Sequence, residues 1–190
     1  MASNTLLVVG DSLSAGYGLN QDEGWVHKLA QRLEKHRTQY DVINASITGD
    51  TTHGGLTRLP AALNLHQPAI VIIELGANDG LRGLSLRLAE NNLREMVRLS
   101  RQAGARVLLL GVKLPRNYGR LYGEQFHSIY TDLAQKKQVP LVSFFLEGVA
   151  ETPALMQADG IHPGKAAQKK ILENVWQGLE ALLDPEALLD

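Results

Sequence analysis

Ser12 lies in the stretch VVGDSLSAGYGL, residues 8–19, where a strand-like run ends in glycine, aspartate and two serines. A serine hydroxyl is a poor nucleophile at neutral pH and needs an adjacent base. The stretch also fits a plain turn, because these residue types are common in turns, or an anion-binding loop at a helix N-terminus. It contains no G-x-G-x-x-G dinucleotide fingerprint, and no lysine follows as in a P-loop. It also departs from the G-x-S-x-G nucleophile elbow, because Ser14 stands in place of the last glycine. From this stretch alone, the three interpretations stay open.

The candidate base for this serine is His162, in the stretch QADGIHPGKAA at residues 157–167. Asp159 precedes it by three residues, so in a turn the carboxylate can accept the Nδ1–H of the imidazole and leave Nε2 free. Pro163 restrains the backbone of His162 to an extended conformation and suits the first position of a helix. The spacing therefore predicts an oriented acid–imidazole pair.

The chain has six histidines, so His162 has competitors. His53 follows Asp50 by three residues, and its loop opens on the same side of the predicted fold. His127 follows Glu124 by three residues, but its pattern predicts a helix flank that faces solvent. The spacing favours His162 over His53 as the base. The remaining histidines fall in helical stretches and are expected at the surface: His27, His36 and His66.

Two further loops carry groups that could stabilise a developing negative charge. Gly49 lies in NASITGDTTHGG, residues 44–55, and without a side chain its N–H could approach a ligand closely. Asn78 lies in ELGANDGLRG, residues 74–83, directly after an apolar strand-like run. Each residue could equally be a local turn former. Their types and positions leave both interpretations open.

These loops would share one location if the chain folds as an α/β domain. Apolar runs rich in β-branched residues recur, and they are continuous rather than alternating, which is typical of strands buried in a parallel sheet. The runs cover residues 5–9, 40–44, 69–75, 106–112 and 140–145. With helical patterns between them, they predict one doubly wound domain over residues 1–190. Ligands in such folds bind beyond the carboxyl ends of the strands.

Apolar stripes at helical spacing predict the helices that separate these strands. The stripes cover residues 25–33, 86–100, 126–133 and 171–182, and the last ends before Pro185. Between the second and third strands, GGLTRLPAALNLH is interrupted by Pro60. Proline removes a backbone donor and suits the first turn of a helix, so we predict two short helical pieces, with Pro60 beginning the second.

Composition excludes several functional classes. The chain has 190 residues, of which 44% are hydrophobic and 21% charged, so it can form a packed core. A formal net charge of -1 gives no basic excess for binding nucleic acid. The absence of cysteine and of H-E-x-x-H or H-x-H spacings argues against a metal centre. No apolar run approaches the ~20 residues of a membrane span, and no signal-peptide pattern opens the sequence.

Four pieces are more specific together than any one of them alone. They are GDSLS at 10–14, Gly49 after the second strand, GAND at 76–79 and DGIHP at 159–163. In this order they resemble the SGNH hydrolase family, also called GDSL lipases and esterases. The resemblance extends over about residues 5–183. The residues that give this family its name are a serine, a glycine, an asparagine and a histidine.

The resemblance assigns catalytic roles to individual residues of this sequence. It implies a catalytic triad of Ser12, Asp159 and His162. It implies an oxyanion hole formed by the backbone N–H of Ser12, the N–H of Gly49 and the side-chain amide of Asn78. The family has a flavodoxin-like three-layer α/β/α fold with a five-stranded parallel sheet, in agreement with the pattern above. No metal or organic cofactor is implied.

Four stretches look closest to the bacterial multifunctional thioesterases, which are also described as proteases, lysophospholipases and arylesterases. They are NASITGDTTHGGLTRLP, ELGANDGLRG, LPRNYGRLY and DGIHP. This similarity implies an esterase and thioesterase that acts on small-molecule acyl-CoA, lysophospholipids and aryl esters. Two loops would line the acyl groove. The implied contact residues are Asp79, Gly80, Leu81, Leu114 and Pro115.

The same branch implies a location and an assembly state. Its members are typically exported, so we expect a periplasmic protein, with the cytoplasm as the alternative because no leader is visible. We expect a monomer that has no stable membrane insertion and no nucleic-acid partner. Two other functions stay open. One is a carbohydrate or peptidoglycan O-acetyl esterase of the same fold, and the other is a flavodoxin-like binding module that holds an anion or a flavin phosphate at residues 10–18.

Overall fold

A computed structural model of the chain describes residues 4–35 and 40–183, and its centre is a five-stranded parallel sheet in the order β2-β1-β3-β4-β5. The strands are β1 (Thr5–Gly10), β2 (Asp41–Asn44), β3 (Ile70–Glu74), β4 (Arg106–Leu110) and β5 (Leu141–Val142). The predicted parallel sheet is confirmed. The last strand is shorter than the apolar run 140–145, because the chain leaves the sheet at Ser143.

The continuous apolar character of the strands reflects burial on both faces of the sheet. All five residues of β3 are buried, and β1 is buried from Leu6 to Gly10. In the register of these two strands, Leu7 pairs with Val71 and Val9 pairs with Ile73. Helices on both sides remove these side chains from water, and this burial is the main term that favours the fold.

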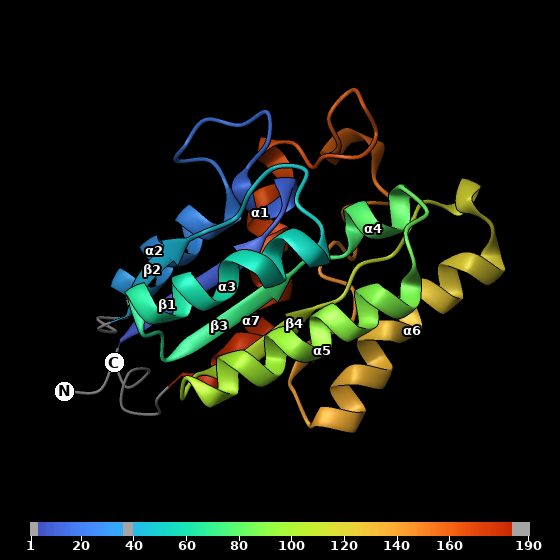
Figure 1. The fold of residues 1–190 in the computed structure, drawn as a ribbon. Helices are drawn as coiled ribbons and strands as arrows, with labels where there is room; N and C mark the ends of the chain where they lie inside the picture. The colour runs from blue at the N-terminus through green and yellow to red at the C-terminus, as the bar shows by residue number, and fades with distance from the viewer. Residues whose placement is uncertain (1–3, 36–39, 184–190) are drawn as a thin grey trace.

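Helices cover the sheet on two sides and complete three layers (Figure 1). Helices α2 (Trp25–Lys35) and α7 (Gln168–Leu179) pack together on one face. On the other face α5 (Leu86–Gln102) lies between α3 (Thr52–His66) and α6 (Arg120–Lys137) and contacts both. The predicted three-layer α/β/α architecture is confirmed.

The region around Pro60 differs from the prediction of two short helical pieces. The structure has one continuous helix, α3, with Pro60 inside it. Leu59 and Leu63 are buried on the face that packs toward the core, whereas Pro60 lies on the exposed side. Proline costs one backbone hydrogen bond there, and packing of the apolar face outweighs that loss. The prediction was wrong because it weighed the local breaker above tertiary burial.

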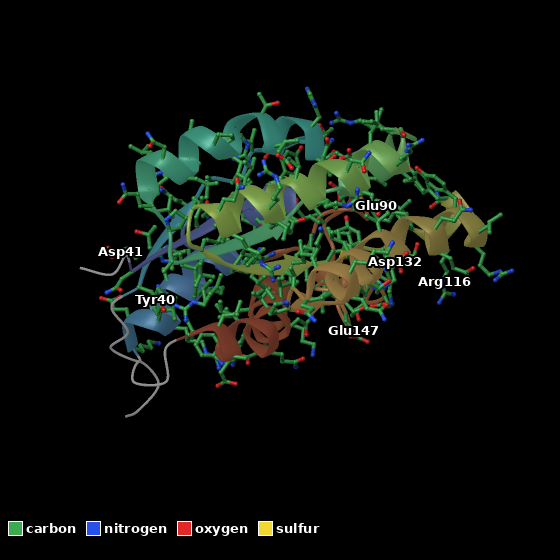
Figure 2. All side chains as sticks on the ribbon, turned by 60° about the horizontal axis from the view of Figure 1, so that its bottom comes forward. Tyr40, Asp41, Glu90, Arg116, Asp132 and Glu147 are labelled. Atoms are coloured by element: carbon green, nitrogen blue, oxygen red, sulfur yellow. The ribbon has the colours of Figure 1, made fainter. Side chains whose placement is uncertain are left out.

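Short helical segments lie at the carboxyl ends of the strands. Helix α1 (Ser12–Ala15) follows β1, and α4 (Ala77–Leu81) follows β3, and both lie at the same end of the sheet in Figure 1. Figure 2 places Arg116 at the end of the molecule opposite Tyr40 and Asp41, and β2 begins at Asp41. The 3₁₀ turns are η1 (Arg116–Tyr118), η2 (Pro153–Leu155), η3 (Lys165–Ala167) and η4 (Glu180–Leu182).

The apolar stripe predicted at residues 171–182 forms two elements. Helix α7 ends at Leu179, and the 3₁₀ turn η4 continues the stripe to Leu182. Pro185, which was expected to follow the end of this helix, lies outside the described residues, as does His36. Within residues 4–35 and 40–183, no helix combines the length and the apolar character that a bilayer crossing requires.

Candidate active site

Three side chains from opposite ends of the chain form one line of hydrogen bonds. Ser12 Oγ lies 2.9 Å from His162 Nε2, although 150 positions separate the two residues. His162 Nδ1 lies 2.6 Å from Asp159 Oδ2. Both distances are within hydrogen-bonding range. The arrangement can pass a proton from a hydroxyl to an imidazole whose other nitrogen faces a carboxylate, which is the geometry of a serine hydrolase triad.

The position of Ser12 follows from a tight turn between β1 and α1. Asp11 caps the short helix α1, because its Oδ1 accepts the N–H of Leu13 at 3.0 Å. Gly16 ends the helix in the left-handed region at φ 78°. Gly10 permits the close approach, since a Cβ there would lie 2.8 Å from both Glu74 Oε2 and Ser14 Oγ. Ser12 is 8% exposed and faces the histidine at the floor of the site.

The loop that carries His162 holds the ring through its own acid. Asp159 Oδ1 accepts the N–H groups of Ile161 and His162 at 2.9 and 3.0 Å, while Oδ2 faces the ring. The backbone N–H of His162, then its ring, then the N–H of Ile161 lower the pKa of Asp159 to about 2. The carboxylate is therefore ionised at neutral pH. Tyr17 packs on the imidazole with ring centroids 4.4 Å apart.

Gly49 lies in a turn that is tied to the nucleophile strand. The N–H of Ile47 donates to the carbonyl of Gly10 at 3.0 Å, which brings the turn beside Ser12. Gly49 has φ +80°, a conformation that favours glycine. Within the described ranges 4–35 and 40–183, the N–H groups of Ser12 and Gly49 donate to no protein acceptor. These two donors can therefore serve an oxygen of a substrate.

Asn78 lies close to the nucleophile turn, and its amide is already engaged. Asn78 Nδ2 donates to Asp11 Oδ2 at 3.1 Å and to the carbonyl of Asp50 at 2.9 Å. Asp11 is the residue before Ser12, so the structure brings the predicted asparagine to the nucleophile turn. Both amide hydrogens have protein acceptors here. To stabilise an oxyanion, Asn78 must exchange one of these bonds for the substrate oxygen.

The competing histidines lie elsewhere. His53 is exposed on α3. His127 is part of a second serine–histidine contact, in which Ser143 Oγ lies 3.3 Å from His127 Nε2 and the carbonyl of Val112 lies 3.1 Å from His127 Nδ1. That pair has a backbone carbonyl where the first has a carboxylate, and its serine is exposed. The geometry therefore favours His162 as the base.

The sequence of the chain matches a known family over most of its length. The model of the GDSL-like lipase/acylhydrolase family matches residues 8–170. The chain belongs to the GDSL-like lipase/acylhydrolase family. The resemblance seen in the sequence is thus confirmed, and the protein is an enzyme of the acyl ester hydrolase class. The alternative of a binding module without catalysis is dropped.

Similar proteins cover nearly the whole of this GDSL-like chain. Esterase TesA of Pseudomonas aeruginosa is 53% identical over 182 residues, which are 96% of this chain and 90% of that protein. Thioesterase 1/protease 1/lysophospholipase L1 of Escherichia coli is 45% identical over 186 residues, or 98% of this chain and 88% of that one. A crystal structure of TesA has a TM-score of 0.93 at 54% identity and covers 94% of this chain and 99% of its own.

The residues expected to line the acyl groove of this GDSL-like hydrolase divide into two groups. Asp79 is buried, and its two oxygens accept the N–H of Thr52 at 2.9 Å and the hydroxyl of Thr52 at 2.6 Å. Its side chain therefore fastens the start of α3 to α4 instead of facing the crevice. For this reason Asp79 is not part of the proposed groove, where the family resemblance had placed it.

The other four groove candidates come from two segments that lie against each other. A Cβ at Gly80 would lie 2.7 Å from Leu114 Cδ2, so α4 packs directly on the segment after β4. Tyr118 Oη donates to the carbonyl of Leu81 at 3.1 Å and fixes the same contact. Leu81 and Leu114 are half-buried, and Pro115 is exposed. These residues can form an apolar wall beside the site.

A buried carboxyl pair beneath the nucleophile was not predicted. Glu74 ends β3 with no exposed surface, and its Oε2 accepts the hydroxyl of Ser14 at 2.7 Å and the N–H of Asp11 at 3.3 Å. Burial, and then the charge of Asp11, raise the pKa of Glu74 well above its usual range. Burial likewise raises the pKa of Asp11 to about 6, although the hydrogen bond from the N–H of Leu13 acts to lower it. We assign the retained proton to Glu74, because His162 and the amide of Asn78 lower the pKa of Asp11, whereas the charge of Asp11 raises the pKa of Glu74.

Replacing Glu74 with glutamine should make the stability of the protein less dependent on pH. A group whose pKa is raised by folding contributes stability that is present below its ordinary pKa of 4.5 and is lost as pH rises. Glutamine is neutral in both states and keeps the acceptor for Ser14 and Asp11. Between pH 5 and pH 8, we expect the Tm of the parent to fall at least about 3 °C further than that of E74Q. Thermal melts followed by circular dichroism at the two pH values check this, and equal shifts would contradict a neutral Glu74.

The acidic and imidazole groups of the described residues do not gather as metal ligands. Within residues 4–35 and 40–183, no three His, Asp or Glu side chains are placed to hold a metal ion together. The imidazole at the site instead has Ser12 on one ring nitrogen and Asp159 on the other. The donor set at the crevice is thus suited to proton transfer.

Proposed function

We propose that the protein is a serine esterase and thioesterase that works through an acyl-enzyme on Ser12. The observation that carries the proposal is the hydrogen-bonded line from Ser12 to His162 to Asp159, with its contacts of 2.9 and 2.6 Å. Family membership supports the same chemistry. We treat residues 1–190 as a single catalytic domain.

Acylation begins with removal of the serine proton. His162 Nε2 takes this proton as Ser12 Oγ forms a bond to the acyl carbon, and the carbonyl oxygen becomes an oxyanion. The ionised Asp159 stabilises the imidazolium and holds its tautomer. The bond from the acyl carbon to the leaving oxygen or sulfur then breaks, and the leaving group departs with the proton from His162. Serine is left as an ester.

Deacylation repeats the sequence with water. His162 takes a proton from water, the resulting oxygen nucleophile attacks the acyl carbon, and Ser12 Oγ leaves with the proton from the imidazole. In both stages the oxyanion would accept hydrogen bonds from the N–H groups of Ser12 and Gly49 and from the amide of Asn78. Removal of one such donor typically costs about 3–4 kcal/mol of transition-state stabilisation. Neither stage requires a metal or an organic cofactor.

The apolar wall beside the site supports a substrate with an acyl chain longer than acetate. Leu81, Leu114 and Pro115 would contact that chain, and Gly80 would let α4 approach it. Acyl-CoA, lysophospholipids and aryl esters are the small-molecule substrates that we propose. The names of the two relatives, esterase for one and thioesterase and lysophospholipase for the other, support this class.

Activity on a series of p-nitrophenyl esters tests the proposal. If the wall binds the chain, kcat/KM should rise by about 3–4-fold for each methylene buried, because a buried methylene is worth about 0.8 kcal/mol. Initial rates with acetate, butyrate, hexanoate and octanoate esters measure this slope. A steep preference for acetate would overturn the proposed substrate class and favour an O-acetyl esterase of the same fold.

We further propose a periplasmic monomer. The similarity of the sequence to exported thioesterases supports the location. Size-exclusion chromatography with light scattering measures the mass, and osmotic-shock fractionation of cells that express the natural gene measures the location.

A further inference from the structure

The proposed oxyanion hole is assembled from pieces that do not share an element. The N–H of Gly49 comes from the turn after β2, and the amide of Asn78 comes from α4 after β3. A transition state needs both donors at one oxygen, and a displacement of about 1 Å can cost 100-fold in rate. Some contact must therefore hold the turn and α4 in a fixed relation.

Arg82 makes that contact at the end of α4. Its Nη2 donates to the carbonyl of Gly49 at 3.0 Å and lies 3.4 Å from Asn78 Oδ1. One nitrogen thus touches both residues that are proposed to supply donors from outside the nucleophile turn. Arg82 is itself exposed and forms these contacts from the solvent side of the crevice.

The contact to Asn78 also fits only one orientation of the amide. A guanidinium donates and cannot accept, so the amide atom turned toward Arg82 must be the oxygen. Since the amide is planar, this places Nδ2 on the opposite side, toward Asp11 and the carbonyl of Asp50. A flipped amide would put two donors against each other at Arg82. Arg82 and the two acceptors of Nδ2 therefore together hold the amide hydrogens toward the nucleophile turn.

A second arginine fixes the same turn from below and does not touch Asn78. Arg58 Nε pairs with Asp50 Oδ2 at 2.8 Å, its Nη2 donates to the carbonyl of Gly10 at 3.3 Å, and its Nη1 donates to the carbonyl of Ala45. The side chain of Arg58 is only 22% exposed. Its bonds join the ends of β1 and β2 and belong to the framework. Arg82 alone of these two bridges the turn to α4.

We propose that Arg82 is a positioning residue that aligns the Gly49 turn and the Asn78 amide for stabilisation of the oxyanion. This inference rests on the proposed function, because it assumes that the two residues supply oxyanion donors. The role requires two acceptors at one cation. Glutamine at position 82 offers no charge and a shorter reach, whereas lysine keeps the charge and can donate to one or both oxygens.

Steady-state kinetics of Arg82→Gln and Arg82→Lys on neutral p-nitrophenyl butyrate tests the role. We expect Arg82→Gln to lower kcat by about 10- to 100-fold with KM within about twofold, because the lost interaction acts on the transition state. Arg82→Lys should recover part of that loss. Arg87→Gln, an exposed arginine in the first turn of α5, is the matched control and should leave kcat unchanged.

A double-mutant cycle with Asn78→Ala separates positioning from an independent effect. If Arg82 acts partly through Asn78, the double variant should be slower than Asn78→Ala by a smaller factor than Arg82→Gln costs on its own, since the two losses are not additive. Full multiplication of the losses would overturn the inference, as would an Arg82→Gln enzyme with parental kcat. A loss confined to KM for acyl-CoA would overturn it by making Arg82 a binding site for the anionic substrate. If Asn78→Ala itself keeps the parental kcat, the oxyanion hole of the proposed function fails instead.

Discussion

The Ser12→Ala enzyme should hydrolyse p-nitrophenyl butyrate about 10⁴- to 10⁶-fold more slowly than the parent, with the protein still folded. Alanine removes the atom that forms the acyl-enzyme and leaves the N–H of residue 12 in place. Among residues 4–35 and 40–183, the side chain of Ser12 hydrogen-bonds only to His162, so its loss should not disturb the core. The measurement is kcat on purified protein, with contaminating parent enzyme titrated by a fluorophosphonate.

A matched control comes from the other serine that contacts a histidine. Ser143→Ala removes the hydroxyl beside His127, and we expect kcat within about twofold of the parent, as for surface substitutions away from a site. The fluorophosphonate should label the parent and Ser143→Ala on Ser12, as mapped by mass spectrometry, and should not label Ser12→Ala. Labelling of Ser143 together with retained activity in Ser12→Ala would reassign the nucleophile.

The His162→Ala enzyme should lose about 10⁴-fold or more in kcat, because Ser12 then has no base. The losses at the two positions should not multiply. The Ser12→Ala, His162→Ala double variant should be about as slow as either single variant, since hydroxyl and imidazole act as one unit. Both singles and the double are compared on the same ester at the same pH.

His53→Ala is the matched control for the base, because His53 also follows an acid by three residues. It lies exposed on α3, and we expect less than a twofold change in kcat. A large loss in His53→Ala, with little loss in His162→Ala, would reverse the assignment of the base. Protonation of Asp159 should not contribute to the pH profile of kcat near pH 5, because the pKa of that carboxyl is lowered to about 2.

The fold could be predicted from the sequence because its strands carry the signal individually. A continuous apolar run such as that of β3 indicates burial on both faces, and alternation with helical stripes fixes the layer order. The prediction of a helix break at Pro60 failed because it relied on one residue instead of a pattern along the element. A single residue suggested a break, but burial of Leu59 and Leu63 on the same helix decided the outcome.

The candidate site was only partly predictable. Asp159 and His162 are close in sequence, so their pairing has a local signal, and family resemblance linked them to Ser12. Arg82 and Glu74 have no such signal, because an arginine that donates to carbonyl groups, or an acid that accepts a hydroxyl, leaves no periodic pattern. Glu74 offered one clue, as a carboxyl at the end of an otherwise apolar strand. Its contact with Ser14 becomes evident only when β1 and β3 are paired.

The acid and the base lie on one short loop, whereas the hydroxyl lies at the other end of the chain. Asp159 bonds the ring and the backbone of His162 within three residues, so the pair needs no part of the sheet to keep its shape. If that loop moves outward to admit a bulky acyl donor, the carboxylate of Asp159 and the imidazole of His162 move together as one unit. The contacts to Ser12 and Tyr17 then break, and return of the loop restores the catalytic arrangement in a single rigid-body step.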